Sequence, residues 1–156
     1  MNCYLFRKLI KNEIQKKMKH ETVLSWKGKM AFESDIDGHK IKLDVPTESG
    51  GDDSGFRPKK LMLISLAGCT GMDVVSILRK MKVELADFDV AVEANLTDEE
   101  PKHYDKMHIV YRFKGANLPI EKLERAVSLS QEKYCGVSAT LKKAVELTWE
   151  IQVENV

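Results

Sequence analysis

The sequence predicts an α+β fold in which an antiparallel sheet packs against one long central apolar helix. Apolar and polar residues alternate through several segments, and this period of two is typical of half-buried strands. Residues 58–81 are apolar on nearly every side, which predicts a helix enclosed by other parts of the protein. Tight-turn signals separate neighbouring strand segments, so the strands are expected to pair mainly as antiparallel neighbours.

Two strands are expected before the helix. Residues 22–32 alternate as one strand, and its inward face carries Leu24, Trp26, Met30 and Phe32. Asp37-Gly38 is a typical tight-turn pair, and the alternation resumes after it in residues 39–45, which predicts a hairpin. A polar, glycine-rich loop then leads to Pro58, a residue that suits the first turn of a helix.

Three strands and two helices are expected after the long helix. Residues 88–96 and 107–113 alternate as strands, and a helix begins at Pro119. The inward stripe of that helix is Leu123, Ala126, Val127, Ser130 and Tyr134. Ser138 is expected to cap a last short helix. Residues 147–153 predict the final strand, so the expected order is β-β-α-β-β-α-α-β.

Charge and hydropathy argue against two classes of partner. The formal net charge is +1 with both signs mixed along the chain, so no basic stripe indicates nucleic-acid binding. Residues 61–78 are just long enough to span a bilayer, but Asp73 alone would cost about 2.5–3.5 kcal/mol at its centre. We therefore expect a helix buried in protein and no membrane span.

Cysteine usage predicts a cytoplasmic protein, and the spacing of its cysteines and histidines argues against a metal site. The three cysteines do not form a secreted disulfide framework, and no signal-peptide pattern precedes them. The chain has no Cys-x-x-Cys pair, and its four histidines lack the spacing of metal ligands.

The domain organisation is expected to be simple. Residues 1–19 predict an N-terminal extension that precedes one domain of residues 20–156. The extension is either an addition with little function or a helix that binds a membrane surface or a partner. Cys3 lies in this extension and receives no role.

Cys69 and Cys135 are the candidate functional side chains. Cys69 lies between Gly68 and Gly71 in the apolar helix, where absent side chains leave room for another backbone or a small ligand. Cys135 lies at a helix break, near backbone N–H groups that favour a thiolate. The alternative is that both are inert core thiols, as single buried cysteines usually are.

Two cysteine-centred motifs carry a family resemblance. The pattern P-x-x-L-x-L-x-x-L-A-G-C-T-x-M-D-V begins at Pro58, and E-K-Y-C-G-V-S follows around Cys135. Together they resemble the OsmC/Ohr family, the osmotically inducible protein C and organic hydroperoxide resistance proteins. The resemblance covers roughly residues 20–153 and is strongest to the less characterised OsmC-like branch.

The resemblance implies an intertwined homodimer, with active sites where the subunits meet, and thiol peroxidase chemistry. Carried over, Cys69 is the peroxidatic thiol that attacks a small organic hydroperoxide, and Cys135 is the resolving thiol that closes a disulfide. A dithiol reductant then reopens that disulfide, and no metal or organic cofactor takes part. A homodimer is also expected because the helix is apolar on more faces than one small domain can cover.

The family stabilises its thiolate with an arginine that a glutamate holds in place. Arg57 is the candidate here, because residues 21–56 contain no arginine; the alternative is an ordinary solvated loop arginine. The family's helix commonly starts Pro-x-Glu-Leu, whereas this chain reads Pro-Lys-Lys-Leu from Pro58. The expected glutamate is therefore absent, and Glu48 in the preceding loop is a weak substitute.

Two other interpretations stay open. The missing glutamate favours non-catalytic binding of a small hydrophobic molecule in the apolar pocket at the dimer interface. A closed Cys69 with its sulfur far from Cys135 would instead favour two purely structural thiols. Asp73, one turn beyond Cys69, either makes a polar contact to a partner or joins the hydrogen-bond network of the thiol.

Overall fold

A computed structural model describes residues 19–156 of the chain. The predicted N-terminal extension and Cys3 lie outside these residues, except for its last position, Lys19. The described chain forms two compact units, which divide between Phe56 and Arg57. The domain boundary expected at residue 20 stays a prediction.

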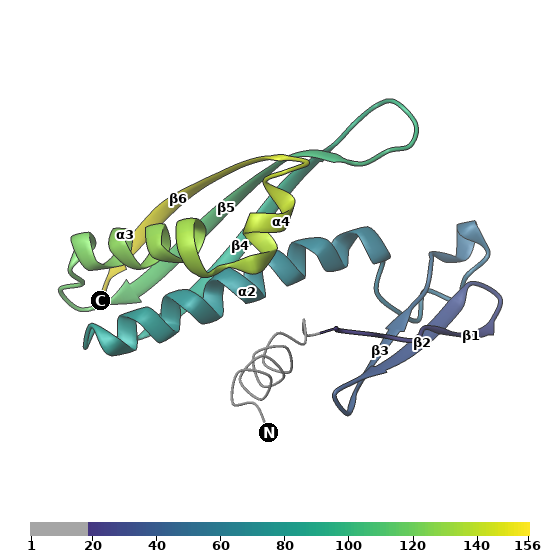
Figure 1. The fold of residues 1–156 in the computed structure, drawn as a ribbon, viewed down its shortest axis with the longest axis horizontal. Helices are drawn as coiled ribbons and strands as arrows, with labels where there is room; N and C mark the ends of the chain where they lie inside the picture. The colour runs from purple at the N-terminus through teal and green to yellow at the C-terminus, as the bar shows by residue number, and fades with distance from the viewer. Residues whose placement is uncertain (1–18) are drawn as a thin grey trace, which may run out of the picture. The chain divides into compact units, whose positions relative to one another are not determined.

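The first unit is a small antiparallel sheet. Its strands are β1 (Ser25–Gly28), β2 (Ala31–Ile36) and β3 (His39–Leu43), paired in that order (Figure 1). The expected turn at Asp37-Gly38 is confirmed, and both residues have positive φ, as a tight hairpin turn requires. The prediction of one strand over residues 22–32 is wrong. The chain reverses at Gly28 and Lys29, whose φ angles are 105° and 44°, so that β1 pairs with β2.

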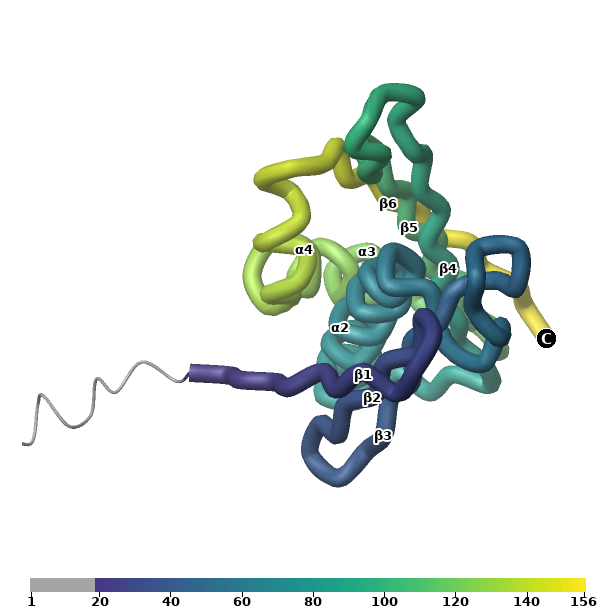
Figure 2. The backbone as a smooth tube through the Cα atoms, turned by 90° about the vertical axis from the view of Figure 1, so that its right-hand side faces the viewer, coloured from purple at the N-terminus to yellow at the C-terminus, as the bar shows by residue number. Residues whose placement is uncertain are grey.

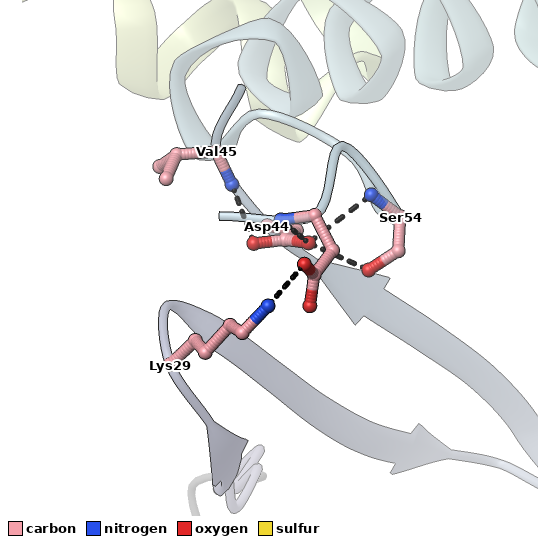
Figure 3. A network of polar contacts seen from close by, with 5 residues as sticks. Lys29, Asp44, Val45 and Ser54 are labelled. Carbon is pink, nitrogen blue, oxygen red and sulfur yellow. Dashed lines mark hydrogen bonds and ion pairs between the residues drawn. The ribbon is translucent and has the colours of Figure 1, made fainter. Parts of the chain in front are cut away.

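The loop after β3 is organised around the Asp44 carboxylate, which is 2% exposed (Figure 3). It accepts hydrogen bonds from the backbone N–H of Val45 at 2.8 Å, from the N–H groups of Asp52 and Ser54 at 3.1 Å, and from Ser54 Oγ at 2.6 Å. These donors, above all Ser54, hold the pKa of Asp44 well below its usual range despite its burial. The Asp44 side chain thus supplies hydrogen bonds that hold this loop together. The loop contains one short helix, η1 (Thr47–Ser49).

The second unit contains the long helix and a three-stranded sheet. Helix α2 (Pro58–Lys80) is followed by β4 (Asp87–Leu96), β5 (Tyr104–Gly115), α3 (Ile120–Leu129), η2 (Ser130–Tyr134), α4 (Gly136–Leu141) and β6 (Glu146–Asn155). The helices gather on one face of the sheet, as two views at right angles show (Figures 1 and 2). The predicted α+β fold with a long apolar helix is therefore confirmed.

The expected antiparallel pairing holds for the first unit and for β4 with β5, but β6 pairs with β5 in parallel. The reason is the connection between them. Helix α3, the turn η2 and helix α4 carry the chain back along the sheet before β6 begins, and a parallel pair needs such a crossover.

The core lies between α2, α3 and the inward face of β5. Its fully buried side chains include Leu66, Val74, Leu78, Met107, Ile109, Tyr111, Phe113 and Leu123. Phe88 of β4 stacks on Phe113, with ring centroids 4.7 Å apart. This core fixes the middle of α2, where Cys69 lies, against α3 and the sheet.

One face of α2 is left exposed by the other described residues, 19–156. Met62, Ile64, Met72 and Val75 are exposed, and 28% of the most apolar stretch of the helix is buried. By length and composition alone α2 could cross a membrane, but the core helix of a soluble protein meets the same criteria. Its buried residues pack within the core just described, which favours the second interpretation.

The segment after α3 departs from the predicted helix. Residues Ser130–Tyr134 form a π turn, in which the Cys135 N–H donates to the Ser130 carbonyl oxygen at 2.8 Å. Tyr134, predicted on the inward stripe, is 52% exposed because the wider turn rotates it outward, while Gln131 is buried. Cys135, five residues after Ser130, is buried in place of Tyr134.

Candidate thiol site

The fold brings Cys69 and Cys135 together. Cys69 lies in the middle of α2 and is half-buried, whereas Cys135 precedes α4 and is 3% exposed; both are free thiols. Their sulfur atoms and one carboxylate oxygen of Asp73 all lie within 4.8 Å of one another. Helix α4 packs against α2, so two segments that are distant in the sequence meet at this point.

Cys135, and not Ser138 as predicted, caps the short helix α4. The Cys135 sulfur accepts a hydrogen bond from the Ser138 backbone N–H at 3.3 Å. The extended backbone at Cys135, with ψ of 100°, turns its side chain back over the first turn of α4. The sequence missed this cap because cysteine is not among the common capping residues.

Burial raises the pKa of the Cys69 thiol. A hydrogen bond from the Val137 backbone acts in the opposite direction, and the nearby Cys135 and Asp73 raise the pKa further. Among the described residues, these main influences include no positive charge. The site as it stands in one chain therefore favours the protonated thiol.

A buried hydroxyl network lies beside the thiols. Thr70 Oγ1 lies 2.6 Å from the Tyr111 hydroxyl and 2.9 Å from Ser130 Oγ, and Gln131 Nε2 donates to both Thr70 and Tyr111. Burial raises the pKa of Tyr111, so its hydroxyl stays protonated and can donate. The sequence placed Ser130 on the inward stripe of a helix but gave no role to its hydroxyl or to the other polar groups.

Asp73 connects this network to the thiols. One carboxylate oxygen accepts a hydrogen bond from Ser130 Oγ at 3.1 Å, and the carboxylate lies within 4.8 Å of both sulfur atoms. The structure therefore supports the second interpretation of Asp73, in which it belongs to the polar network beside the thiols. Its contact to that network is the hydrogen bond from Ser130 of the same chain.

Arg57 is not brought to the thiols of its own chain. It is half-buried at the start of α2, three turns before Cys69. At 1.5 Å per residue, the two Cα atoms are about 18 Å apart along the helix, well beyond the reach of an arginine side chain. Only an Arg57 from another copy of the chain could act on this sulfur.

An open groove of about 920 Å³ runs along α2 and β4, and Gly68, which precedes Cys69, lies in its wall. Its lining residues are Ala67, Gly68, Gly71, Met72, Val75, Ser76, Arg79, Lys80, Phe88 and Val90. A side chain at Gly71 would touch Val90 and Phe88, whereas one at Gly68 would meet nothing in the described chain. Gly71 thus allows α2 to approach β4, and Gly68 leaves open space at the position before Cys69.

Comparisons with known proteins show which family the chain belongs to. Residues 51–150 match the family model for OsmC-like protein. Protein YhfA of Escherichia coli (strain K12) is 33% identical over 116 residues, 74% of this chain and 84% of that protein. The crystal structure of a hypothetical protein from Aquifex aeolicus VF5 is 31% identical, with a TM-score of 0.74 over 88% of this chain and 99% of that one.

A more distant structural neighbour is an organic hydroperoxide resistance protein OsmC from Legionella pneumophila. It is 21% identical, with a TM-score of 0.64 over 87% of this chain and 99% of that one. At this identity the likeness shows the fold alone. It extends the shared fold over both units of the described chain.

Proposed function

This chain belongs to the OsmC-like protein family, as its sequence motifs predicted, and on that premise we propose that it is a cysteine-dependent hydroperoxide reductase. One observation carries the proposal. Two free thiols from distant segments, Cys69 and Cys135, have their sulfur atoms within 4.8 Å of each other. A disulfide needs the sulfur atoms about 2.05 Å apart, so the pair is near bonding but reduced.

The proposed reaction has three steps. The Cys69 thiolate attacks the terminal oxygen of an organic hydroperoxide, the O–O bond breaks, and the alkoxide leaves and takes up a proton to become an alcohol. The Cys69 sulfenic acid that remains condenses with the Cys135 thiol, which forms a disulfide and releases water. A dithiol reductant then restores both thiols and becomes a disulfide itself.

Accessibility supports the roles of the two cysteines. Cys69 is half-buried and follows Gly68, which lines the open groove, whereas Cys135 is 3% exposed. A nucleophile has to reach the substrate oxygen, so Cys69 is the better attacking group. Cys135 needs to reach only Cys69.

The influences on the pKa of Cys69 within the described residues support a homodimer. The pKa of Cys69 is raised within its own chain, and the Arg57 of that chain is too far along α2 to lower it. The exposed apolar residues of α2, among them Met62 and Ile64, offer a surface for a second copy. We propose that this copy supplies the arginine and completes the site.

The groove favours a hydroperoxide with an apolar substituent. Met72, Val75, Phe88 and Val90 supply the apolar lining of the groove, whose wall also includes Gly68, the residue before Cys69. A cytoplasmic location suits the mechanism, because cellular dithiols there keep resting cysteines reduced.

A direct test is to titrate the reduced full-length protein with cumene hydroperoxide and to count free thiols. We expect Cys69 and Cys135 to be lost together as the alcohol appears, and a Cys3→Ser variant to lose the same two thiols. Intact thiols after prolonged exposure to excess peroxide would overturn the proposal.

The second candidate is a binding protein for a small hydrophobic molecule. Two observations favour it: the chain has Lys60 where the family's helix carries a glutamate, and the pKa of Cys69 is raised. This candidate predicts that cumyl alcohol, the unreactive product, binds in the groove of the wild type while cumene hydroperoxide leaves the thiols intact. The thiol titration therefore separates the two functions.

A further inference from the structure

We propose that Cys69, Asp73 and Cys135 form a binding site for a thiophilic divalent cation such as Zn²⁺. One ligand atom from each residue lies within 4.8 Å of the other two. In a tetrahedral zinc site, bond lengths of about 2.0–2.3 Å place neighbouring ligand atoms roughly 3.3–3.8 Å apart. Small side-chain rotations would therefore bring these three atoms to coordination distance.

The positions of the three residues suit a rigid site. Cys69 and Asp73 are four residues apart on α2, so their side chains lie on the same face of one helix. Cys135 is fixed by its place between the π turn and α4. The sequence predicted no metal site because it contains no Cys-x-x-Cys pair, but here the fold supplies the pairing that local spacing lacks.

The chemistry of the three ligands selects the kind of ion. Two thiolates and a carboxylate suit Zn²⁺ or Co²⁺, whereas Ca²⁺ and Mg²⁺ require sites built from oxygen ligands. Binding releases the protons of both thiols, and the bound cation then balances acidic groups that otherwise face one another. A water molecule would complete four-coordination.

Two of the proposed ligands accept hydrogen bonds from neighbouring groups. Ser130 Oγ donates to Asp73 at 3.1 Å, and the Ser138 N–H donates to the Cys135 sulfur at 3.3 Å. Such outer contacts orient ligands in metal sites. The Ser138 hydroxyl is itself fully buried without a hydrogen-bond partner in residues 19–156, and a metal-bound water is one group that can satisfy such an oxygen.

Metal binding and thiol oxidation would exclude each other. A zinc-bound thiolate pair cannot close a disulfide without releasing the ion, and the disulfide lacks the thiolates that the ion needs. The metal site itself does not depend on the proposed peroxidase activity, because its three ligands are present in the reduced protein whether or not Cys69 reacts with peroxide.

The test is an anaerobic titration of the reduced, metal-free full-length chain with Co²⁺, without peroxide. We expect a thiolate-to-cobalt charge-transfer band that saturates at one ion per chain and is lost when Zn²⁺ is added. Zinc binding should also release the protons of two thiols. A Cys3→Ser variant should show the same band, which excludes Cys3 as a ligand.

The Asp73→Asn variant tests the third ligand and keeps the size of the side chain. We expect its affinity for Co²⁺ to fall at least about tenfold, while the control Asp89→Asn, on the exposed surface of β4, binds as the wild type does. A circular dichroism spectrum equal to that of the wild type shows that the variant is folded; if it is not, Asp73→Ala, which also lacks the carboxylate, takes its place.

Absence of the charge-transfer band in the reduced wild type would overturn the site, and so would full affinity in the folded Asp73 variant. Because no peroxide is present, failure of this titration leaves the thiol titration with cumene hydroperoxide unaffected. If the protein bound Co²⁺ but did not react with peroxide, the proposed metal site would be supported and the proposed peroxidase activity would be overturned.

Discussion

Each unit of this protein surrounds one carboxylate, and the two surroundings are opposite in character. In the first unit, Asp44 accepts hydrogen bonds from the backbone of Val45, Asp52 and Ser54 and from the Ser54 hydroxyl. In the second unit, Asp73 receives one hydrogen bond from Ser130 and otherwise lies beside two thiols. The first carboxylate meets donors, and the second meets other acids.

The effects on pKa follow this difference. Donors lower the pKa of Asp44, whereas burial, together with Cys135 and Asp73, raises the pKa of Cys69. A buried acid that is fully supplied with donors stabilises a fold. Acidic side chains that lie close together without a positive charge destabilise the folded state. Such a cluster therefore indicates a catalytic or ligand-binding site. The predictions below test this contrast.

The largest expected effect is the loss of activity in Cys69→Ser, which should consume no hydroperoxide. Cys135→Ser should still consume about one equivalent and leave a sulfenic acid on Cys69. Dimedone labelling followed by mass spectrometry detects that acid. If the Cys69→Ser variant instead carried the dimedone adduct on Cys135, the roles of the two cysteines would be reversed.

The next effect concerns the missing positive charge. Removing a cation that lowers the pKa of Cys69 by one unit reduces the thiolate fraction about tenfold at neutral pH. We therefore expect Arg57→Ala to consume the first equivalent of peroxide at least about tenfold more slowly and to shift the pH–rate profile upward. Arg112→Ala, which loses an exposed arginine on β5, is the control. An unchanged profile in Arg57→Ala would remove Arg57 from the site.

The contrast between the two carboxylates predicts opposite effects on stability. Asp44→Asn replaces an acceptor by an amide donor among N–H groups, so it should clearly lower the urea midpoint of unfolding. Asp73→Asn removes a negative charge from beside the thiols and should leave the midpoint nearly unchanged. Fluorescence of Trp26 in a Trp149→Phe background follows the first unit, and fluorescence of Trp149 in a Trp26→Phe background follows the second. Equal losses in both variants would contradict the contrast.

The low pKa of Asp44 predicts a pH dependence of stability. Its folded-state pKa lies below the ordinary value of about 3.9, so the stabilisation is fully present above that value. It is lost as the pH falls through the lower folded-state pKa. Urea unfolding between neutral and strongly acidic pH should show the wild type converging on Asp44→Asn only in acid. A difference that stays constant with pH would argue against the carboxylate network.

The smallest effect is expected in the hydroxyl network. Tyr111→Phe removes the oxygen that lies 2.6 Å from Thr70 and 2.7 Å from Gln131, so it should destabilise the protein by about 1–2 kcal/mol. Tyr134→Phe is the matched control, because that side chain is exposed. A Tyr111→Phe variant as stable as the control would show that the network does not support the site.

Sequence patterns predicted the elements that depend on local signals. Helix α2 begins at Pro58 as predicted, and the turn at Asp37-Gly38 lies where expected. The turn after β1 was missed because Trp26 pairs directly with Phe32. Residues that face each other across a hairpin share one face of the sheet, so the alternation continues through the turn and hides it.

The site was predicted less completely because it depends on backbone hydrogen bonding and tertiary contacts. Motifs singled out Cys69 and Cys135, but the π turn that makes Cys135 face inward is a shift of one hydrogen bond and leaves no mark on hydrophobic periodicity. The bonds from Thr70 to Tyr111 and Ser130 join three distant segments. Only the fold shows that these polar residues meet.

The central claim is that Cys69 and Cys135 act as one redox pair within a single chain. The most direct measurement is peptide mapping by mass spectrometry, without reduction, after treatment with stoichiometric cumene hydroperoxide. The account predicts one disulfide-linked pair of peptides that contains Cys69 and Cys135, formed within monomeric chains and absent when either cysteine is replaced by serine. Peptides with both thiols still reduced, or a disulfide from Cys69 to Cys3, would contradict it.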